Sequence, residues 1–133
     1  MITAINHINI KAPSDLLERV RDFYCSVLGL HTGHRPAFKS HGYWLYAGDS
    51  SIIHLSEATV LSSGDSDAIA TTGYFNHIAF SCQDLAQTKE QLELFGISYT
   101  VNSVPETQQV QLFLTDPSGL GVELNFALAI SLD

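Results

Sequence analysis

The stretch Asn6-His7-Ile8 near the start of the chain returns as Asn76-His77-Ile78 in the second half. Such a return indicates repeated structural units when the segments that follow each copy also match. After each copy, the hydrophobic pattern predicts a strand, one helix and then three short strands, in that order. The repeat therefore predicts an α+β chain built from two βαβββ modules.

Start and stop signals frame both expected helices. Asp15 with Glu18, and Asp84 with Gln87, have the spacing of a capping box, and a glycine stands at each expected C-terminus. In the first half we expect a strand at Ile5–Ile10, a helix ending at Gly29, and strands at about His31–Phe38, Gly42–Ala47 and Ser51–Glu57. In the second half we expect a strand at Phe75–Ser81, a helix ending at Gly96, and strands at about Ile97–Asn102, Gln109–Thr115 and Gly121–Ala127.

Length and composition predict one globular domain over residues 1–133, with module one at about 1–57, a linker at about 58–73 and module two at about 74–127. The net charge of −8, with only 6 Lys and Arg, argues against nucleic acid and against an anionic membrane surface as partners. No apolar run is long enough to span a membrane, and the N-terminus does not read as a signal peptide. Cys25 and Cys82 fit reduced thiols, so we expect a cytoplasmic protein.

Four metal-binding residue types fall at matching places of the repeat. His7 and His77 lie on the first strand of each module, on the face opposite the apolar side chains. His54 and Glu123 lie on the last strand of each module, again opposite apolar neighbours. A solvated sheet face is the alternative explanation, but such a face normally carries Lys, Glu, Thr and Arg. Imidazole and carboxylate groups suit Zn, Ni, Fe(II) or Mn, so the four residues predict a divalent metal site.

Longer stretches of the chain resemble a known family. Asn76-His77-Ile78-Ala79-Phe80, and the run from Phe113 through Asp116-Pro117-Ser118-Gly119 to Val122-Glu123-Leu124, resemble the second module of glyoxalase I, bleomycin-resistance and extradiol dioxygenase proteins. Phe23-Tyr24-Cys25-Ser26-Val27-Leu28-Gly29-Leu30 is similar to the first helix of those proteins. Together these stretches resemble the vicinal oxygen chelate superfamily over nearly the whole chain.

The resemblance implies a cupped mixed sheet made of two βαβββ modules, with the helices outside and a divalent metal inside. It puts His7, His77 and Glu123 at the metal-ligand positions of the family. His54 falls where glyoxalase I has a carboxylate that binds metal and exchanges the substrate proton. His54 is therefore expected as a fourth ligand or a proton-transfer base, and His54 and Glu123 as catalytic residues. In chains of this size the modules commonly pair between chains, which implies a homodimer with shared sites.

The leading functional hypothesis is a metal-dependent enzyme that acts on a small molecule through bidentate oxygen chelation. The reaction is either isomerase- or lyase-type proton transfer or extradiol-type ring cleavage. Arg35, Gln111 and Asn125 are candidate substrate contacts, because Arg suits a carboxylate and the two amides could orient a ligand. The alternative is a metal-free binding or drug-sequestering protein of the bleomycin-resistance type, for which the net charge favours cationic ligands. Arg35 and Lys39 lie close together, but no cluster of Lys and Arg suited to a phosphonate stands out, which argues against a thiol transferase of the fosfomycin-resistance type.

Overall fold

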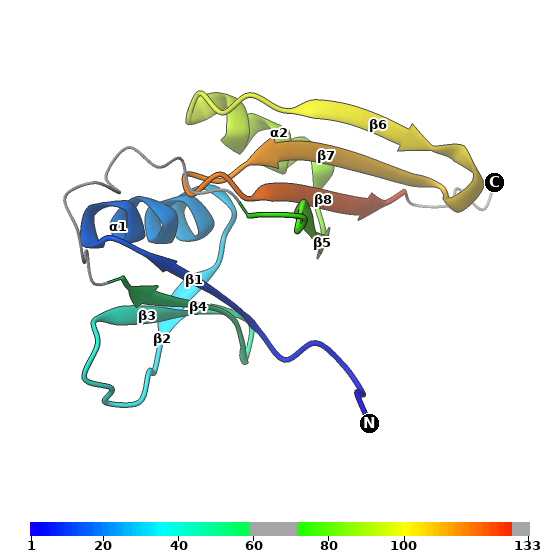
Figure 1. Cartoon of the computed structure of the whole chain (residues 1–133). Coiled ribbons are helices and arrows are strands. Elements are labelled where there is room, and N and C mark those ends of the chain that lie inside the picture. Colours follow the sequence, from blue (N-terminus) through cyan, green and yellow to red (C-terminus); the bar gives the residue numbers. More distant parts are fainter. Residues whose placement is uncertain (59–71, 129–133) are drawn as a thin grey trace. The chain divides into compact units, whose positions relative to one another are not determined.

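The computed structural model describes residues 1–58 and 72–128, and the chain divides into two compact units, Met1–Ile69 and Ala70–Asp133 (Figure 1). The division falls inside the expected linker 58–73, most of which lies outside the described residues. Within the ranges that the structure describes, no helix is long and apolar enough to cross a membrane.

The first unit is a four-stranded mixed sheet with one helical segment. Strands β1 and β4 are parallel neighbours, and the order across the sheet is β1-β4-β3-β2. The other neighbouring pairs, β4 with β3 and β3 with β2, are antiparallel. The elements are β1 (Ile8–Ala12), α1 (Ser14–Asp22), the π-helical turn η1 (Phe23–Val27), β2 (His31–Gly33), β3 (Gly42–Ala47) and β4 (Ser50–Glu57).

The apolar side of α1 packs against β1, β3 and β4. Leu17 and Val20 of the helix are fully buried, and so are Leu45 and Ile53 of the strands, because alternate side chains of a strand point to one face. The capping box expected at Asp15 is wrong. Pro13 occupies the N-cap position and supplies no side-chain hydrogen bond, so Asp15 falls inside the first turn, where a carboxylate still suits the helix dipole.

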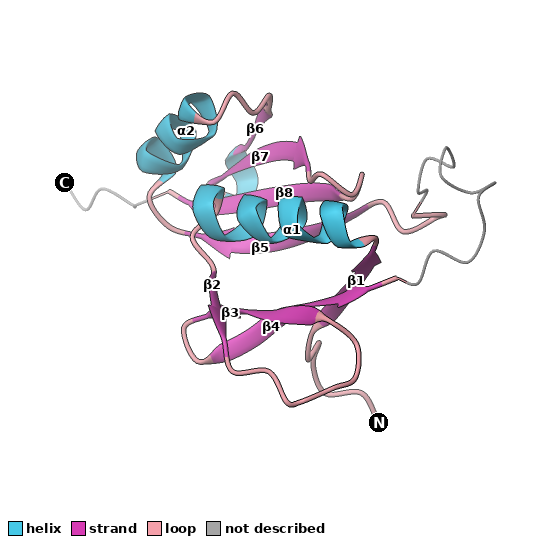
Figure 2. Ribbon diagram, turned by 90° about the vertical axis from the view of Figure 1, so that its left-hand side faces the viewer, coloured by secondary structure: helices cyan, strands magenta, loops and turns pink. Residues whose placement is uncertain are grey.

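The second unit repeats the topology of the first, with the sheet order β5-β8-β7-β6 and β5 parallel to β8 (Figure 2). The capping interaction expected at Asp84 is present, since its carboxylate accepts a hydrogen bond from the Gln87 backbone N–H at 3.1 Å. The elements are β5 (His77–Cys82), α2 (Leu85–Leu94), β6 (Thr100–Val104), the 3₁₀ turn η2 (Pro105–Thr107), β7 (Gln109–Thr115) and β8 (Gly121–Ala127).

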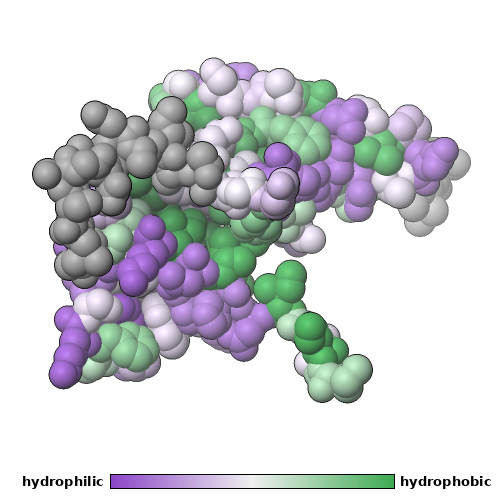
Figure 3. All heavy atoms as spheres, in the orientation of Figure 1, coloured by the Kyte–Doolittle hydropathy of each residue, from purple (hydrophilic) through white to green (hydrophobic). Residues whose placement is uncertain are grey.

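The two sheets confirm the α+β prediction of two βαβββ modules. Strand β2 ends at Gly33 and not at Phe38, because Pro36 has no backbone N–H for a sheet ladder and the Phe38 N–H bonds to the Pro36 carbonyl. Strand β1 starts at Ile8 and not at Ile5, so the apolar N-terminal end is at the surface (Figure 3). Strand β6 starts late because the Ile97 N–H completes the end of α2 by bonding to Leu92.

Candidate metal centre

His77 and Glu123 form one pair of the expected donors in the second unit. In the parallel pairing of β5 and β8, Ala79 lies opposite Glu123, so His77 and Glu123 are diagonal neighbours on one face. The His77 Nε2 atom lies 3.7 Å from Glu123 Oε1, and the Glu123 side chain is only 12% exposed. Two ligand atoms at about 2.0–2.2 Å from one ion lie roughly 3–4 Å apart, so this spacing fits a shared divalent metal.

Hydrogen bonds behind both donors fix their orientation. The Nδ1 atom of His77 is 2.8 Å from Asn76 Oδ1, which can only accept, and an Nδ1–H that donates to this oxygen leaves Nε2 as the nitrogen that can bind a metal. The Glu123 Oε2 atom accepts a hydrogen bond from the Asn125 side-chain amide, leaving Oε1 toward His77. From the sequence, Asn125 was expected to contact the substrate, whereas Asn76 was not singled out, although it belongs to the repeated Asn-His dipeptide.

Gly121 lets strand β8 approach His77 closely. It lies opposite His77 in the strand pairing, and its N–H donates to the Asn76 carbonyl at 3.2 Å. A Cβ atom at this position would lie 2.6 Å from that carbonyl oxygen and 2.9 Å from the His77 Cβ. Both separations are shorter than real contacts allow. Only glycine therefore lets β8 come close enough to His77 to place Glu123 beside it.

The turn before β8 is held by a buried carboxylate. Asp116 is 4% exposed, and its Oδ1 atom accepts hydrogen bonds from the Ser118 N–H at 2.8 Å and the Leu120 N–H at 3.1 Å. This Asx-type turn fixes where β8 begins, and therefore where Glu123 lies along the sheet.

His7 and His54 form the corresponding pair in the first unit, in a three-ring stack with Trp44. The His7 and His54 ring centroids are 3.7 Å apart with an interplanar angle of 16°, and those of His54 and Trp44 are 4.0 Å apart at 7°. The His7 Nδ1 atom is 2.8 Å from Asn6 Oδ1, which repeats the arrangement at His77. In the second unit Phe113 occupies the position of Trp44, since it lies opposite Glu123 as Trp44 lies opposite His54.

The stacked geometry separates the roles of His7 and His54. An imidazole lone pair lies in the plane of its ring, so two rings stacked face to face cannot both direct a lone pair at one ion. Burial lowers the pKa of His54 and the nearby charge of His7 lowers it further, whereas a hydrogen bond with Ser51 raises it and the charge of Arg35 makes the smallest, lowering contribution. His54 is therefore held as a neutral imidazole, which can accept a proton.

Of the three expected substrate contacts, Arg35 lies in the first unit, and Gln111 and Asn125 lie in the second. Arg35 lines a pocket of about 740 Å³ in the first unit, together with His7, His54 and Trp44. Gln111 accepts a hydrogen bond from the Asn102 amide at 2.9 Å, and it lies opposite Asn125 in the β7–β8 pairing. In the described part of the chain, the buried Asn125 Oδ1 has no hydrogen-bond donor, so a ligand group could supply one.

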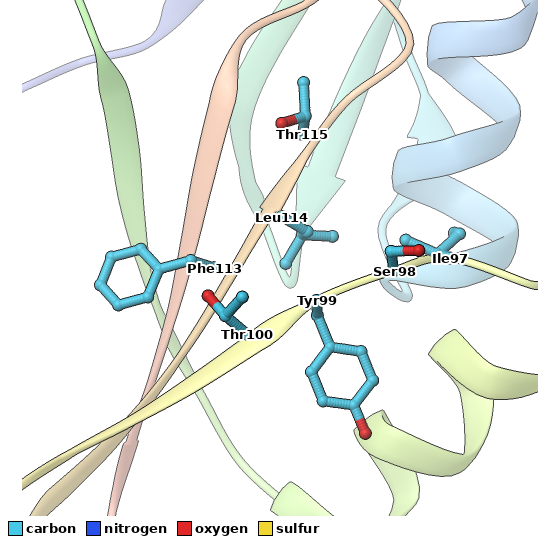
Figure 4. A pocket seen from close by; sticks show the side chains of 7 residues that line it. All are labelled: Ile97, Ser98, Tyr99, Thr100, Phe113, Leu114 and Thr115. Carbon is cyan, nitrogen blue, oxygen red and sulfur yellow. The ribbon is translucent and has the colours of Figure 1, made fainter.

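A second pocket, of about 390 Å³, lies between the start of β6 and the end of β7 (Figure 4). Ile97–Thr100 and Phe113–Thr115 line it, and the Tyr99 ring extends toward α2, where its hydroxyl donates to Glu93 at 3.0 Å. Phe113 also contacts His77, with ring centroids 6.5 Å apart. The expected metal donors do not line this pocket, so it is not the candidate centre.

The structure brings the four expected donors together two by two. His7 lies against His54, and His77 lies against Glu123. Among residues 1–58 and 72–128, no group of three or more His, Cys, Asp or Glu could by itself hold an ion. Each unit thus presents two of the donors that the sequence singled out.

Comparison with solved structures supports the fold. A protein from Bacillus anthracis assigned to the glyoxalase family has a TM-score of 0.70 and 23% identity, with 96% of this chain and 98% of that chain covered. A mutant of the fosfomycin resistance protein FosX from Listeria monocytogenes, solved with Mn(II) and a dihydroxypropylphosphonic acid, has a TM-score of 0.68 and 16% identity, covering 96% and 95%. A virulence protein from Salmonella typhimurium has a TM-score of 0.66 and 16% identity, covering 96% and 99%.

Comparison with curated proteins gave no match. A family model, described as the Glyoxalase/Bleomycin resistance protein/Dioxygenase superfamily, matches residues 4–124. This match spans nearly all of the described sequence, including His7, His54, His77 and Glu123. The chain therefore belongs to the glyoxalase, bleomycin resistance protein and dioxygenase superfamily.

Proposed function

We propose that the protein is a metal-dependent enzyme acting on a small molecule that offers two oxygens to the ion. The observation that carries this proposal is the His77–Glu123 pair, with donor atoms 3.7 Å apart and a hydrogen bond behind each of them. Surface His–Glu contacts are common, but an imidazole whose Nδ1 lies beside a side-chain oxygen and whose Nε2 faces a largely buried carboxylate has the arrangement typical of metal ligands.

The number of ligands requires donors from both units. A catalytic metal centre usually takes three protein ligands and leaves positions open for water or substrate. We assign His7, His77 and Glu123 to these three places, because the two histidines share the same Asn-oriented geometry. The two units that supply these ligands could belong to one chain or to two chains of a homodimer. We propose the homodimer.

His54 is assigned to proton transfer. Its stacking on His7 disfavours ligation of the same ion, and its lowered pKa keeps it neutral at neutral pH. Trp44 holds the opposite face of the ring, so the imidazole edge is the part of His54 that can meet a substrate proton. A bound divalent ion would polarise the substrate oxygens and so make the neighbouring proton more acidic.

The identity of the metal determines the type of reaction. Imidazole and carboxylate donors suit Zn, Ni, Fe(II) or Mn. Zn or Ni supports isomerase- or lyase-type proton transfer, in which His54 and Glu123 are the catalytic side chains. Fe(II) supports extradiol-type ring cleavage, which predicts oxygen consumption with a catechol. The FosX structure with Mn(II) is consistent with divalent metal binding by this fold.

The test is metal content by mass spectrometry on protein purified without added metal. We expect about one divalent ion per chain, lost in His77→Ala and in Glu123→Gln. His34→Ala and Glu106→Gln are the matched controls, since both residues are exposed and lie outside the two pairs. Wild-type protein that holds no ion, even after reconstitution with each of the four metals, would sink the metalloenzyme proposal.

A metal-free binding protein is the second candidate. The pocket of about 740 Å³ beside Trp44 and Phe38 favours it, because such a pocket can hold a small molecule without an ion. In the described ranges the donors also gather only in twos. Ligand binding by metal-free protein, together with no metal uptake, would favour this candidate over the enzyme.

The cellular setting is part of the proposal. Cys25 and Cys82 are both free thiols, and burial raises the pKa of each, so neither is activated as a nucleophile. Reduced thiols of this kind fit a cytoplasmic protein. Analytical ultracentrifugation of the full chain tests the proposed homodimer.

A further inference from the structure

The pocket beside His7 and His54 is lined by cations in an otherwise acidic chain. The chain has 6 Lys and Arg against 14 Asp and Glu, yet both Arg35 and Lys39 line this pocket. None of the residues that line it, all of which belong to the described part of the chain, is an Asp or Glu. The Lys and Arg side chains of the pocket therefore have no carboxylate beside them in its lining, although the chain as a whole is acidic.

The Arg35 guanidinium is held in place by neutral groups. Its Nη1 atom donates to the Ser40 carbonyl at 2.9 Å, and its Cζ atom lies 4.9 Å from the centre of the Phe38 ring. Gly42 leaves room for it, since a Cβ there would lie 2.9 Å from Arg35 Nη2. Within the described residues no carboxylate pairs with Arg35, so its charge is positioned but not compensated.

An aromatic wall adjoins these cations. Trp44 and Phe38 line the same pocket, with ring centroids 6.3 Å apart. One face of the Trp44 ring is stacked on the His54 imidazole. A volume of about 740 Å³ is within the range of small-molecule sites. The pocket thus joins a cationic end, an aromatic wall and a neutral imidazole.

We propose that Arg35 and Lys39 bind an oxyanion on the substrate, so that the substrate class is a small carboxylate or phosphate-type anion whose body lies against Trp44. This inference rests on the proposed function in one respect, because it takes the pocket beside His7 and His54 as the substrate pocket. It replaces the cationic ligand that the net charge of −8 favoured, and it corrects the expectation from the sequence that the chain has no cations suited to a phosphonate. A guanidinium suits both kinds of oxyanion, since its parallel N–H groups match two oxygens.

Trp44 provides the measurement, because it is the one tryptophan of the sequence and lines the pocket. Metal-free protein is titrated with benzoate, with inorganic phosphate and with benzamide, a neutral analogue of benzoate, while tryptophan emission is recorded. We expect saturable binding of at least one anion and binding of benzamide that is about tenfold weaker than that of benzoate or absent. Saturation by benzoate alone identifies a carboxylate, and saturation by phosphate alone identifies a phosphate-type group.

The variants separate the cations of the pocket from general charge. Arg35→Gln and Lys39→Gln should each weaken anion binding, Arg35→Gln by about tenfold, whereas Arg35→Lys should retain part of the affinity. Arg19→Gln is the control, because Arg19 is exposed on α1 and does not line the pocket. Thermal unfolding of each variant identifies any that fails to fold, and for those the salt dependence of wild-type binding carries the test, since added NaCl must weaken benzoate and not benzamide.

Benzamide binding as tight as benzoate binding would overturn the inference, as would the absence of binding by both benzoate and phosphate, or unchanged anion binding in both glutamine variants. Because the titration uses metal-free protein, its outcome is independent of metal content. Anion binding without any metal uptake would leave the oxyanion site standing and remove the enzyme proposal. Metal uptake without anion binding would do the reverse.

Discussion

The Asn76–His77 hydrogen bond offers a quantitative test of the metal centre, through the variant Asn76→Ala. The substitution removes the acceptor 2.8 Å from His77 Nδ1, but it keeps the backbone carbonyl that accepts from the Gly121 N–H. A hydrogen bond of this kind contributes about 0.5–1.5 kcal/mol, which corresponds to roughly a two- to twelvefold change in affinity. Free exchange of the ring proton between the two nitrogens adds to the loss, and removal of such partners typically costs about 10–100-fold. Because both residues are exposed, we expect about tenfold weaker metal binding.

The assay is competition for the ion with a coloured chelator, using wild-type protein and the variant side by side. Asn102→Ala is the matched control, because Asn102 also makes a surface hydrogen bond in the same sheet, to Gln111 at 2.9 Å, but contacts no expected ligand. Asn76→Asp should keep or raise the affinity, since a carboxylate accepts the same proton more strongly. If Asn76→Ala changes the affinity by less than about twofold, or no more than the control does, the orientation of His77 by Asn76 is not what prepares a metal site.

Three further predictions concern the same residues. Gly121→Ala should destabilise the fold by about 1–3 kcal/mol in chemical denaturation and weaken metal binding, because its Cβ would meet the Asn76 carbonyl at 2.6 Å; wild-type behaviour would contradict this. Mixing His7→Ala protein with His77→Ala protein, after partial unfolding and refolding, should restore about a quarter of the metal sites if the centres are shared between chains, and none if they form within one chain. Metal-free wild-type protein should lose thermal stability between about pH 7.5 and pH 5.5, because the pKa of His54 in the folded state lies below its ordinary 6.5 and acid therefore favours the unfolded chain. His54→Gln should flatten that loss, and an identical slope in both proteins would show that His54 does not cause it.

The element order was predictable because it rests on short-range signals that occur twice. Strands β3, β7 and β8 begin and end at the predicted residues, and in β7 and β8 buried side chains alternate with partly exposed ones between clear turns. The strand ends that were predicted wrongly depend on single backbone interactions. Strand β2 ends before Pro36, and the Ile97 N–H bonds to the end of α2. The spacing of apolar residues does not reveal either interaction.

The candidate site was predictable as a set of residues but not as an arrangement. Alternation could place His7, His54, His77 and Glu123 on one kind of face, because that depends only on parity along a strand. It could not reveal the stacking of His54 between His7 and Trp44, which depends on side-chain rotamers and on the register of β1, β3 and β4. Arg35 was expected as a substrate contact from its residue type, whereas nothing in the sequence indicated that Lys39 lines the same pocket as the two histidines.

The repeat fixes positions, whereas the differences between its two copies carry the chemistry. His54 and Glu123 occupy equivalent places in the strand pairing. His54 lies opposite the residue two positions after His7, and Glu123 lies opposite the residue two positions after His77. Each of these two histidines has an asparagine oxygen beside its Nδ1 atom. Yet His54 is a neutral base between aromatic rings and Glu123 a carboxylate oriented by Asn125. A site with two equivalent carboxylates would bind an ion more strongly but would have no uncharged base beside it. The exchange His54→Glu should therefore raise metal affinity and, by removing the neutral imidazole, lower turnover, and a variant that gained both would refute the division of roles drawn between His54 and Glu123.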